Sequence, residues 1–466
     1  MALTLKFILK QHTPLIHFQE NARDATIRAT ELKPKLDRFL TEQKLEGFEG
    51  SKQLLVGYSQ SNESALKERW KKEGFRALDY TLRIQVEKLN TRKEILGRTI
   101  QVIDQQKQVK TVPTFFANLG DEYKDAPKYL VEADTSLTFT SLHPELLTLI
   151  PRWLDEFLWH HNFGTRQSKG WGGFTIEKSA DCEYTPYVPQ GFFHFSIPTQ
   201  DWLKCFETIN NFYRLLRSGL NGVKEDVNGV VTARMHYCKP VIYEYASFNH
   251  KTTPKTLVLQ WEKKTIKQTV FATSMPDLAA DIKTHSLSGV PDHPLTVTAA
   301  NQHVIKDLLG FATAETWRFR GHDPAVTKKF PTTLEKTHVP TRRDSQGNLE
   351  EEIRRMKSPM FIKPVKEGVG FRVYFKFETI PDQIKGAIIK FVNGKNNHQI
   401  PVWTPPVNFF EDMIRFAAND IVWSTFFDAN PKYNDPAKME GETLKNEIIR
   451  IFSEIKTNLP IPTSND

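Results

Sequence analysis

The sequence predicts an α+β protein made of two units, each an antiparallel sheet with helices packed on one face. Its 466 residues exceed the roughly 250 to 300 residues at which a single hydrophobic core stops growing. Alternating apolar segments typical of strands are interleaved with segments of helical periodicity, which favours a mixed architecture. We expect a first unit over residues 1–221 and a second, more divergent unit over residues 222–466.

The first half alternates strands and helices in a definite order. "LTLKFILKQ" from Leu3 reads as a strand, and a helix is expected to begin at Thr30, its N-cap, with Pro34 in the first turn. The alternating segment Leu78–Asn90 is expected to pair with the first strand. The remaining predicted elements are a helix over 143–164, a glycine loop, a strand over 190–197 and a helix from Asp201. This order is typical of a ferredoxin-like (RRM-like) sandwich.

The second half has a less regular pattern. "KTLVLQWEKK" and "HPLTVTA" read as strands, "NQHVIKDLLGFA" as a helix, and the stretch from His322 to Glu352 as polar and basic without periodicity. "RRMKSPMFIKPV" and "VGFRVYFKFETI" predict a hairpin around Lys366–Gly368. Two apolar-periodic segments, 406–427 and 441–456, predict helices close to the C-terminus.

Composition is that of a folded chain with an excess of positive charge. Hydrophobic residues make up 39% and charged residues 25%, so a disordered chain is excluded. The formal charge of +8 favours a polyanionic partner, since lysine and arginine release counterions from it on binding. Charge alone does not separate RNA, DNA and an anionic membrane surface.

The spacing of the cysteines and the lack of long apolar runs predict the cellular compartment. The three cysteines, Cys182, Cys205 and Cys238, are widely spaced and form no CxxC pair, so neither a disulfide framework nor a metal site is indicated. The N-terminal segment alternates and lacks a cleavage motif, and no run reaches the roughly 18 apolar residues of a membrane span. We expect a cytoplasmic protein without a cofactor and without membrane contact.

The sequence contains no established catalytic motif. Walker loops, GxSxG, HExxH and paired-aspartate signatures are all absent. His160 and His161 are adjacent, so on a helix they point in different directions and do not share a metal. His12 and His17 flank a turn and are candidates for acid/base chemistry, but no partner residue is evident in the sequence. We therefore expect no enzyme.

The most informative stretch is "RQSKGWGGFTIEK", Arg166 to Lys178. Loops that hold nucleotide phosphates open into a helix, whereas this glycine loop runs directly into a strand-like segment, which argues against a mononucleotide site. Basic side chains, glycines and an aromatic ring together are the groups that grip a ribose-phosphate chain. The alternative is a glycine-rich turn with Trp171 in the core.

Three basic clusters at predicted element junctions favour a shared RNA surface, although each alone is compatible with an ordinary solvated surface. They are Arg28, Lys33, Lys35 and Arg38; Arg166, Lys169, Gly170, Trp171, Gly172 and Gly173; and Arg342, Arg343, Arg354, Arg355, Lys357 and Lys363.

Four of these segments, in order, resemble the RAMP superfamily of CRISPR type III effector complexes. They are "TPLIHF", "IRATELKPKLDRFL", "RQSKGWGGFTI" and "RMKSPMFIKPV". The glycine loop with a downstream Ser-Pro strand most resembles the first RAMP subunit of the Cmr (type III-B) module, and a Csm-type relative is left open. The chain departs from the family pattern at "HFQENARDA", which lacks glycines, and at Pro34.

The resemblance implies two ferredoxin-like units and a non-catalytic subunit in antiviral defence. Such a subunit caps the 3′ side of the crRNA filament, contacts crRNA or target RNA and binds other RAMP subunits. Carried over by position, the first basic cluster matches the basic residues of the family's first helix, and the second cluster, without Trp171, matches its glycine loop. Lys357 and Ser358 match the Ser-Pro strand.

Two alternatives remain. One is a metal-independent RNA-processing endonuclease of the same superfamily, for which His12, His17 and His161 are the candidates. The other is a scaffold subunit without direct RNA contact.

Overall fold

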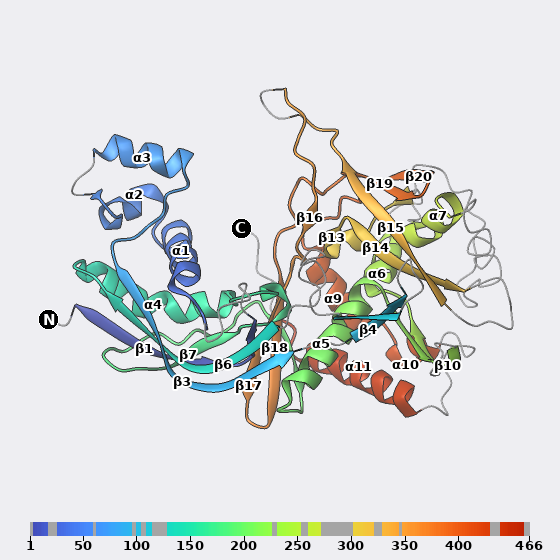
Figure 1. Ribbon diagram of the computed structural model, residues 1–466, viewed down its shortest axis with the longest axis horizontal. Helices are drawn as coiled ribbons and strands as arrows, with labels where there is room; N and C mark the ends of the chain where they lie inside the picture. Colours follow the sequence, from blue (N-terminus) through green and yellow to red (C-terminus); the bar gives the residue numbers. More distant parts are fainter. Residues whose placement is uncertain are drawn as a thin grey trace. The chain divides into compact units, whose positions relative to one another are not determined.

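The computed structural model describes most of the chain in two compact units (Figure 1). The described residues are 3–16, 26–58, 62–95, 99–103, 109–113, 128–225, 231–252, 260–271, 302–320, 329–343, 347–428 and 439–460. The first unit comprises Met1–Phe192, Phe361–Tyr374 and Thr463–Asp466, and the second comprises Phe193–Met360 and Phe375–Pro462. A short segment from late in the sequence therefore belongs to the first unit. The boundary that the sequence predicts at residue 221 stays a prediction.

The first unit is built on one antiparallel sheet. Along the sheet β3 pairs with β6, β6 with β1, and β1 with β7, while the short β2 also pairs with β6. Its strands are β1 (Thr4–Gln11), β2 (Leu15–Ile16), β3 (Thr81–Ile95), β6 (Lys128–Thr140) and β7 (Phe174–Ser179). The segments β4 (Thr99–Ile103) and β5 (Val109–Pro113) form a separate hairpin.

Two helices cover the sheet and complete the predicted ferredoxin-like order. In sequence the elements run β1, α1, β3, β6, α4, β7, which is the split β-α-β arrangement. The two covering helices are α1 (Ala29–Phe39) and α4 (Pro144–His160). Two further helices, α2 (Phe48–Ser51) and α3 (Glu63–Lys72), lie between α1 and β3 in the sequence. The α+β class is confirmed.

Alternation along the strands and helical spacing on α1 and α4 produce the core of the first unit. Phe7 of β1 and Phe139 of β6 are both fully buried, and their rings pack edge to face with centroids 5.9 Å apart. Leu36 on α1 and Leu154 on α4 have no exposed surface and belong to the same apolar cluster. The core therefore lies between the sheet and these two helices.

Three details of the first half differ from the sequence prediction. β3 pairs with β6 and not with β1. In a split β-α-β unit a third strand lies between the two strands that the helix connects, and here β6 lies between β1 and β3. Arg28, in extended conformation, precedes α1 as its N-cap in place of Thr30. The predicted helix over 143–164 ends at His160, since His161 has extended backbone angles.

The second unit contains a four-stranded antiparallel sheet in the order β14-β15-β19-β20. Its strands are β8 (Phe193–Ile197), β9 (Leu220–Glu225), β10 (Val231–Cys238), β11 (Gln260–Trp261), β12 (Gln302–His303), β13 (Phe311–Ala312), β14 (Ala314–Arg320), β15 (Lys329–Val339), β16 (Arg355–Met356), β19 (Ile388–Asn393) and β20 (Asn396–Pro401). β17 (Met360–Glu367) and β18 (Gly370–Phe377) form the predicted hairpin, which is confirmed, and most of it, Phe361–Tyr374, belongs to the first unit.

Helices of the second unit pack on these strands. They are α5 (Trp202–Arg217), α6 (Val241–Thr252), α7 (Glu262–Thr269), α9 (Phe409–Asn419), α10 (Trp423–Asp428) and α11 (Met439–Thr457). The predicted start of α5 is confirmed, because the Asp201 side chain accepts a hydrogen bond from the backbone N–H of Leu203 at 2.9 Å. The two C-terminal helical segments are confirmed as α9 with α10, and α11. Among the described residues, no helix is long and apolar enough to cross a bilayer.

Several elements among the described residues between 260 and 339 differ from the sequence prediction. Of the predicted strand 255–264 the structure describes residues 260–264, which comprise the two residues of β11 and the start of α7 at Glu262. The predicted helix 301–312 is a 3₁₀ turn, Lys306–Leu309, between the short strands β12 and β13. The predicted strand 293–299 lies outside the described residues.

β15 shows why the hydrophobic pattern is misleading in this part of the sequence. It lies within the stretch that is expected to lack periodicity, yet Leu334, Lys336 and His338 are all at most 1% exposed. These residues alternate at the strand period of two. Because two of the three inward positions hold a lysine and a histidine, the alternation is invisible to a hydrophobic pattern.

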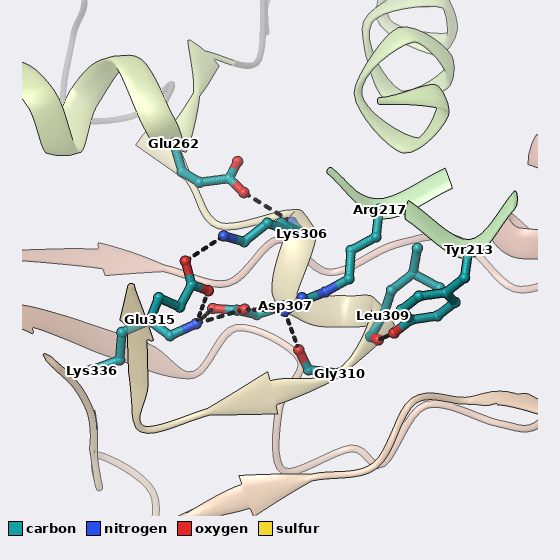
Figure 2. Close-up of polar contacts among 9 residues, drawn as sticks. All are labelled: Tyr213, Arg217, Glu262, Lys306, Asp307, Leu309, Gly310, Glu315 and Lys336. Carbon is teal, nitrogen blue, oxygen red and sulfur yellow. Dashed lines mark hydrogen bonds and ion pairs between the residues drawn. The ribbon is translucent and has the colours of Figure 1, made fainter. Parts of the chain in front are cut away.

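The buried lysine of β15 is the centre of an ionic cluster (Figure 2). Lys336 Nζ lies 2.8 Å and 2.9 Å from the two Asp307 carboxylate oxygens and 2.6 Å from Glu315 Oε1. Burial alone would lower the pKa of Lys336, but the two carboxylates raise it above its ordinary value. The lysine is therefore charged, and its charge is matched inside the second unit.

Neighbouring groups complete the cluster on both sides. Lys306 Nζ lies 2.6 Å from Glu315 Oε2, and the Arg217 guanidinium donates to the Gly310 carbonyl at 2.8 Å. The fully buried Glu262 accepts a hydrogen bond from the Lys306 backbone N–H at 3.1 Å, and burial raises the pKa of its carboxyl group. Such a network ties α5, α7, the 3₁₀ turn, β14 and β15 together.

The variant Lys336→Met is expected to destabilise the second unit by about 3 to 5 kcal/mol, because it leaves the buried Asp307 carboxylate with only the longer, 3.4 Å contact to Arg217. Urea unfolding of the full chain measures this change. Lys357→Met is the matched control, since it breaks an exposed 2.6 Å pair with Glu378 in the same unit. The control should change stability by less than about 1 kcal/mol. Equal effects of the two variants would contradict the structural role of the cluster.

Candidate nucleic-acid interface

The glycine loop, residues 161–173, joins α4 to β7 in the first unit. It contains a short 3₁₀ turn, Gln167–Lys169, and then enters β7, so the predicted strand after the loop is confirmed. Among the described strands β7 pairs with β1 and stands at the end of the strand order, as an edge strand does. Arg166 has a left-handed backbone with φ of 56°, which is uncommon for a residue with a side chain.

The loop is fixed on the turn between β1 and β2. The Gly172 N–H donates to the Pro14 carbonyl at 3.0 Å, and the Thr13 hydroxyl donates to the Gly170 carbonyl at 2.8 Å. The same hydroxyl accepts from the Gly173 N–H at 2.9 Å. The backbone of the loop is therefore bound to its own unit on this side.

The glycines of the loop serve close packing within the protein. A Cβ on Gly172, which has φ of +67°, would lie 2.0 Å from the Phe163 carbonyl oxygen. A Cβ on Gly170 would lie 2.7 Å from Pro364 Cδ. Gly170, Gly172 and Gly173 are all buried. The expectation that these glycines admit an RNA backbone is corrected: they admit neighbouring segments of the same chain.

Trp171 is also internal. Its side chain is 2% exposed, so it does not present a ring face on which a base could stack. This position matches the alternative that the sequence left open, in which the tryptophan packs in the core. We withdraw Trp171 from the predicted RNA contacts together with the three glycines.

The structure brings the first two basic clusters together at Gln167. Lys35 Nζ lies 2.9 Å from Gln167 Oε1 and 2.9 Å from Glu31 Oε1. The Gln167 side-chain amide donates to Glu31 Oε1 at 2.7 Å and to the Gly164 carbonyl at 2.7 Å. Arg166 and Lys169 are partly exposed and lie on or next to the same short turn as Gln167, but the Lys169 ammonium nitrogen itself is buried. We call Glu31, Lys35 and Gln167 the clasp.

The other cations of the first cluster lie differently. Lys33 Nζ binds Asp37 at 2.7 Å and the Leu78 carbonyl at 2.9 Å, and it lies 3.9 Å from the centre of the Tyr80 ring. Lys33 is therefore used inside the unit. Arg38 is exposed, and Arg28 is partly exposed at the start of α1.

Lys363 of β17 is fully buried and closes the base of the loop. Its ammonium group donates to the carbonyls of Leu158, His161 and Phe174 at 2.6 Å, 3.1 Å and 2.9 Å. Burial lowers the pKa of Lys363 to about 7, a shift that Asp155 partly opposes. With no exposed surface, Lys363 is removed from the predicted RNA contacts.

The histidines are engaged in structural contacts. His12 is 2% exposed; its Nδ1 accepts from the Lys366 backbone N–H at 3.1 Å, and its Nε2 lies 2.8 Å from the Thr175 hydroxyl. Burial, followed by three nearby lysines, lowers the pKa of His12 well below its ordinary value, so the ring is neutral. His161 stacks on Phe157 with ring centres 4.3 Å apart. His17 lies outside the described residues.

The third basic cluster belongs to the second unit, apart from Lys363. Arg342, Arg343, Arg354, Arg355 and Lys357 are exposed, whereas Ser358 is 7% exposed. Arg342 binds the carbonyls of Asp382 and Lys385, and Arg343 binds the Gly347 carbonyl. Lys357 is paired with Glu378 at 2.6 Å.

Sequence reasoning missed several residues that position the loop. Glu31 and Gln167 were not singled out, nor was Asn162, whose side-chain amide donates to the carbonyls of Gln167 and Ile362 at 2.7 Å and 2.9 Å. Only the i,i+4 spacing of Glu31 and Lys35 on a predicted helix was visible as a signal. Within the part of the chain that the structure describes, no group of three His, Cys, Asp or Glu residues could hold a metal ion.

Comparison with known families covers most of the sequence. The family described as the Cmr1 N-terminal domain matches residues 2–220, and that described as the Cmr1 C-terminal domain matches residues 237–439. The chain belongs to the Cmr1 family. The resemblance to the first RAMP subunit of the type III-B Cmr module is thereby confirmed, and a Csm-type assignment falls away.

One solved Cmr1 structure is similar to this chain, at low sequence identity and with a low TM-score. A solved structure of Cmr1 from Pyrococcus furiosus, in its apo form, is 10% identical and covers 88% of this chain and 95% of its own. The TM-score is 0.29, so no structural conclusion rests on this likeness. No curated protein matches the sequence.

The variant Gly172→Ala is expected to destabilise the first unit by about 3 kcal/mol or more, because its Cβ would collide with a backbone oxygen that is itself fixed. Gly191→Ala is the matched control. Gly191 also has a positive φ, of +75°, but has nothing within 4 Å of the added Cβ, so only about 1 to 2 kcal/mol of backbone strain applies. Thermal unfolding measures both. A loss of stability no larger than that of the control would show that the loop does not need the close approach.

The stability of the chain is expected to rise with pH above about 7 through Lys363. Its pKa is near 7 in the folded state and 10.5 ordinarily, so the unfolded state binds more protons between these values. The slope from this group is at most about 1.4 kcal/mol per pH unit. The variant Lys363→Met removes the slope. Parallel stability curves for the wild type and the variant, measured by urea unfolding at several pH values across the slightly alkaline range, would contradict this assignment.

Proposed function

We propose that this Cmr1-family chain is a non-catalytic RNA-binding subunit of a CRISPR type III effector complex in antiviral defence. It caps the 3′ side of the crRNA filament in the cytoplasm, contacts crRNA or target RNA and binds neighbouring RAMP subunits. Membership of a multi-subunit Cmr complex follows from the family. RNA contact and the capping position are the proposal.

One observation carries the RNA contact. The clasp joins α1 to the glycine loop, so that Lys35 and the turn carrying Arg166 and Lys169 lie at one place in the first unit. A loop held by hydrogen bonds on several sides presents the partly exposed Arg166 and Lys35 with little loss of conformational entropy on binding. Phosphate oxygens are the natural partners of arginine and lysine side chains arranged in this way.

The proposed contact is to the RNA backbone and therefore carries no sequence information of its own. Phosphate contacts position a nucleic acid, whereas base edges specify it. Since Trp171 is buried, base stacking on the loop is not part of the proposal. The exposed arginines of the second unit, Arg342, Arg343, Arg354 and Arg355, are proposed as a further phosphate-binding region.

The chemistry of the described residues gives no support to the endonuclease alternative. Both nitrogens of the His12 ring are within hydrogen-bond distance of protein groups, and its lowered pKa leaves it uncharged at neutral pH. Acid/base cleavage needs a histidine that exchanges protons with the substrate. His12 is thus better described as a residue that holds β1, β7 and β17 together.

The double variant Arg166→Ala with Lys169→Ala is expected to weaken binding of a single-stranded RNA several-fold. Because Lys169 Nζ is buried, the unfolding free energy of the variant is measured alongside its RNA affinity. The steepness of the plot of log K against log salt should also fall by about 0.7 for each phosphate group that the variant no longer neutralises. Filter binding at several salt concentrations measures both quantities. Lys71→Ala with Lys72→Ala, on exposed positions of α3, removes the same charge and serves as the control.

The comparison of the two double variants decides the assignment. A larger decrease in affinity for the loop variant supports the proposal, whereas equal decreases show that only net charge matters and that the loop does not bind RNA. Cleavage of repeat RNA without added metal by the wild-type chain would favour the endonuclease instead. The absence of any measurable RNA binding would favour the scaffold alternative.

A further inference from the structure

The clasp contains a carboxylate in a place that suits a phosphate. Glu31 Oε1 accepts hydrogen bonds from Lys35 Nζ at 2.9 Å and from the Gln167 amide at 2.7 Å. The Gly164 backbone N–H donates to both carboxylate oxygens, at 3.1 Å and 3.3 Å. A cation, a side-chain amide and a backbone N–H therefore converge on one anionic group.

This set of donors is the kind that binds phosphate oxygens in proteins. Backbone N–H groups, amides and lysine all contact nucleic-acid phosphates. Two of the three donors belong to the glycine loop, so Glu31 reaches across from α1 to fill a position that the loop creates. The side chains of Glu31 and Lys35 are 19% and 29% exposed, so solvent and ligands have access to the position.

We propose that the Glu31 carboxylate stands in for a phosphate, and that a phosphodiester group of RNA replaces it in a subsite formed by Lys35, Gln167 and the Gly164 N–H. The identity of the natural ligand rests on the proposed function, while the subsite itself does not. Glu31 has three rotatable side-chain bonds and turns outward when the phosphate enters. No covalent step is involved.

Internal competition of this kind gives selectivity. A tethered carboxylate has a high effective concentration at the subsite, so a single free phosphate competes poorly. An RNA strand that is already held by Arg166 and Lys169 presents its next phosphate at a comparable local concentration. The subsite therefore opens to a polyanion and stays closed to inorganic phosphate and to mononucleotides.

The variant Glu31→Ala is expected to gain a phosphate site. Added potassium phosphate should raise the unfolding temperature of Glu31→Ala above that in potassium chloride of equal ionic strength, because a ligand that binds only the folded state stabilises it. The wild type should show no such difference. In the double variant Glu31→Ala with Lys35→Met, the stabilisation by phosphate should disappear.

The RNA arm uses the same variants. Glu31→Ala should bind single-stranded RNA about 5- to 10-fold more tightly, since the binding-competent state no longer has to be reached by displacing the carboxylate. Glu31→Gln, which keeps the side-chain shape, is the second variant in case the alanine variant is unstable, and it should move in the same direction. Glu68→Ala, on exposed α3, removes an equal charge away from the loop and should change affinity less.

Three results separate the possibilities. If Glu31→Ala and Glu31→Gln both lower RNA affinity and neither is stabilised by phosphate, Glu31 is a structural tether and the inference is overturned. An effect of Glu68→Ala equal to that of Glu31→Ala would also overturn it, because bulk charge would then explain the change. Stabilisation of Glu31→Ala by phosphate alongside RNA binding that is insensitive to Arg166 and Lys169 supports the subsite while refuting the proposed RNA contact.

Discussion

The buried ammonium group of Lys363 fixes the geometry on which the rest of the first unit's surface depends. Its partners are the carbonyls of Leu158 and His161, where α4 ends, and of Phe174, where β7 begins, so one side chain holds both ends of the glycine loop. Burial disfavours the charged form and lowers the pKa of Lys363 to about 7. When the group is protonated, each of its N–H bonds has an acceptor. Because Lys363 lies on β17, the loop takes its shape from a segment about 200 residues later in the sequence.

The glycines of this loop have a different role from those of a phosphate-binding loop that precedes a helix. There, glycines expose backbone N–H groups to the ligand. In this chain Gly170 and Gly172 are turned inward, where their missing side chains let Pro364 and the Phe163 carbonyl approach. Arg166 stays partly exposed, and its left-handed backbone shows that the surrounding contacts impose the local conformation. The buried glycines thus make the loop rigid, whereas the partly exposed Arg166 supplies its charge.

Much of the fold could be read from the sequence, because β1, α5 and the β17–β18 hairpin follow their hydrophobic periods closely. β15 could not, since its buried Lys336 and His338 interrupt the apolar alternation and are stabilised only by partners elsewhere in the chain. The candidate site could be predicted only in part, because a sequence does not show which cations have acceptors inside the protein. Composition located the basic segments, but Lys33 and Lys363 look like Lys35 in a sequence until their acceptors are known. The clasp residues Glu31 and Gln167 carried no distinctive signal beyond helical spacing.

The fate of the predicted cations bears on how mutations in such a chain are interpreted. Lys33 and Lys363 are each bound to acceptors within their own unit, so neither contributes a phosphate contact directly. Replacing Lys363 nevertheless disturbs the loop that carries Arg166, and RNA affinity would fall because the loop changes shape. Weaker binding alone therefore does not identify a residue that touches RNA. Residues that touch RNA change the salt dependence of binding while leaving the unfolding free energy unchanged, whereas buried cations change the unfolding free energy first.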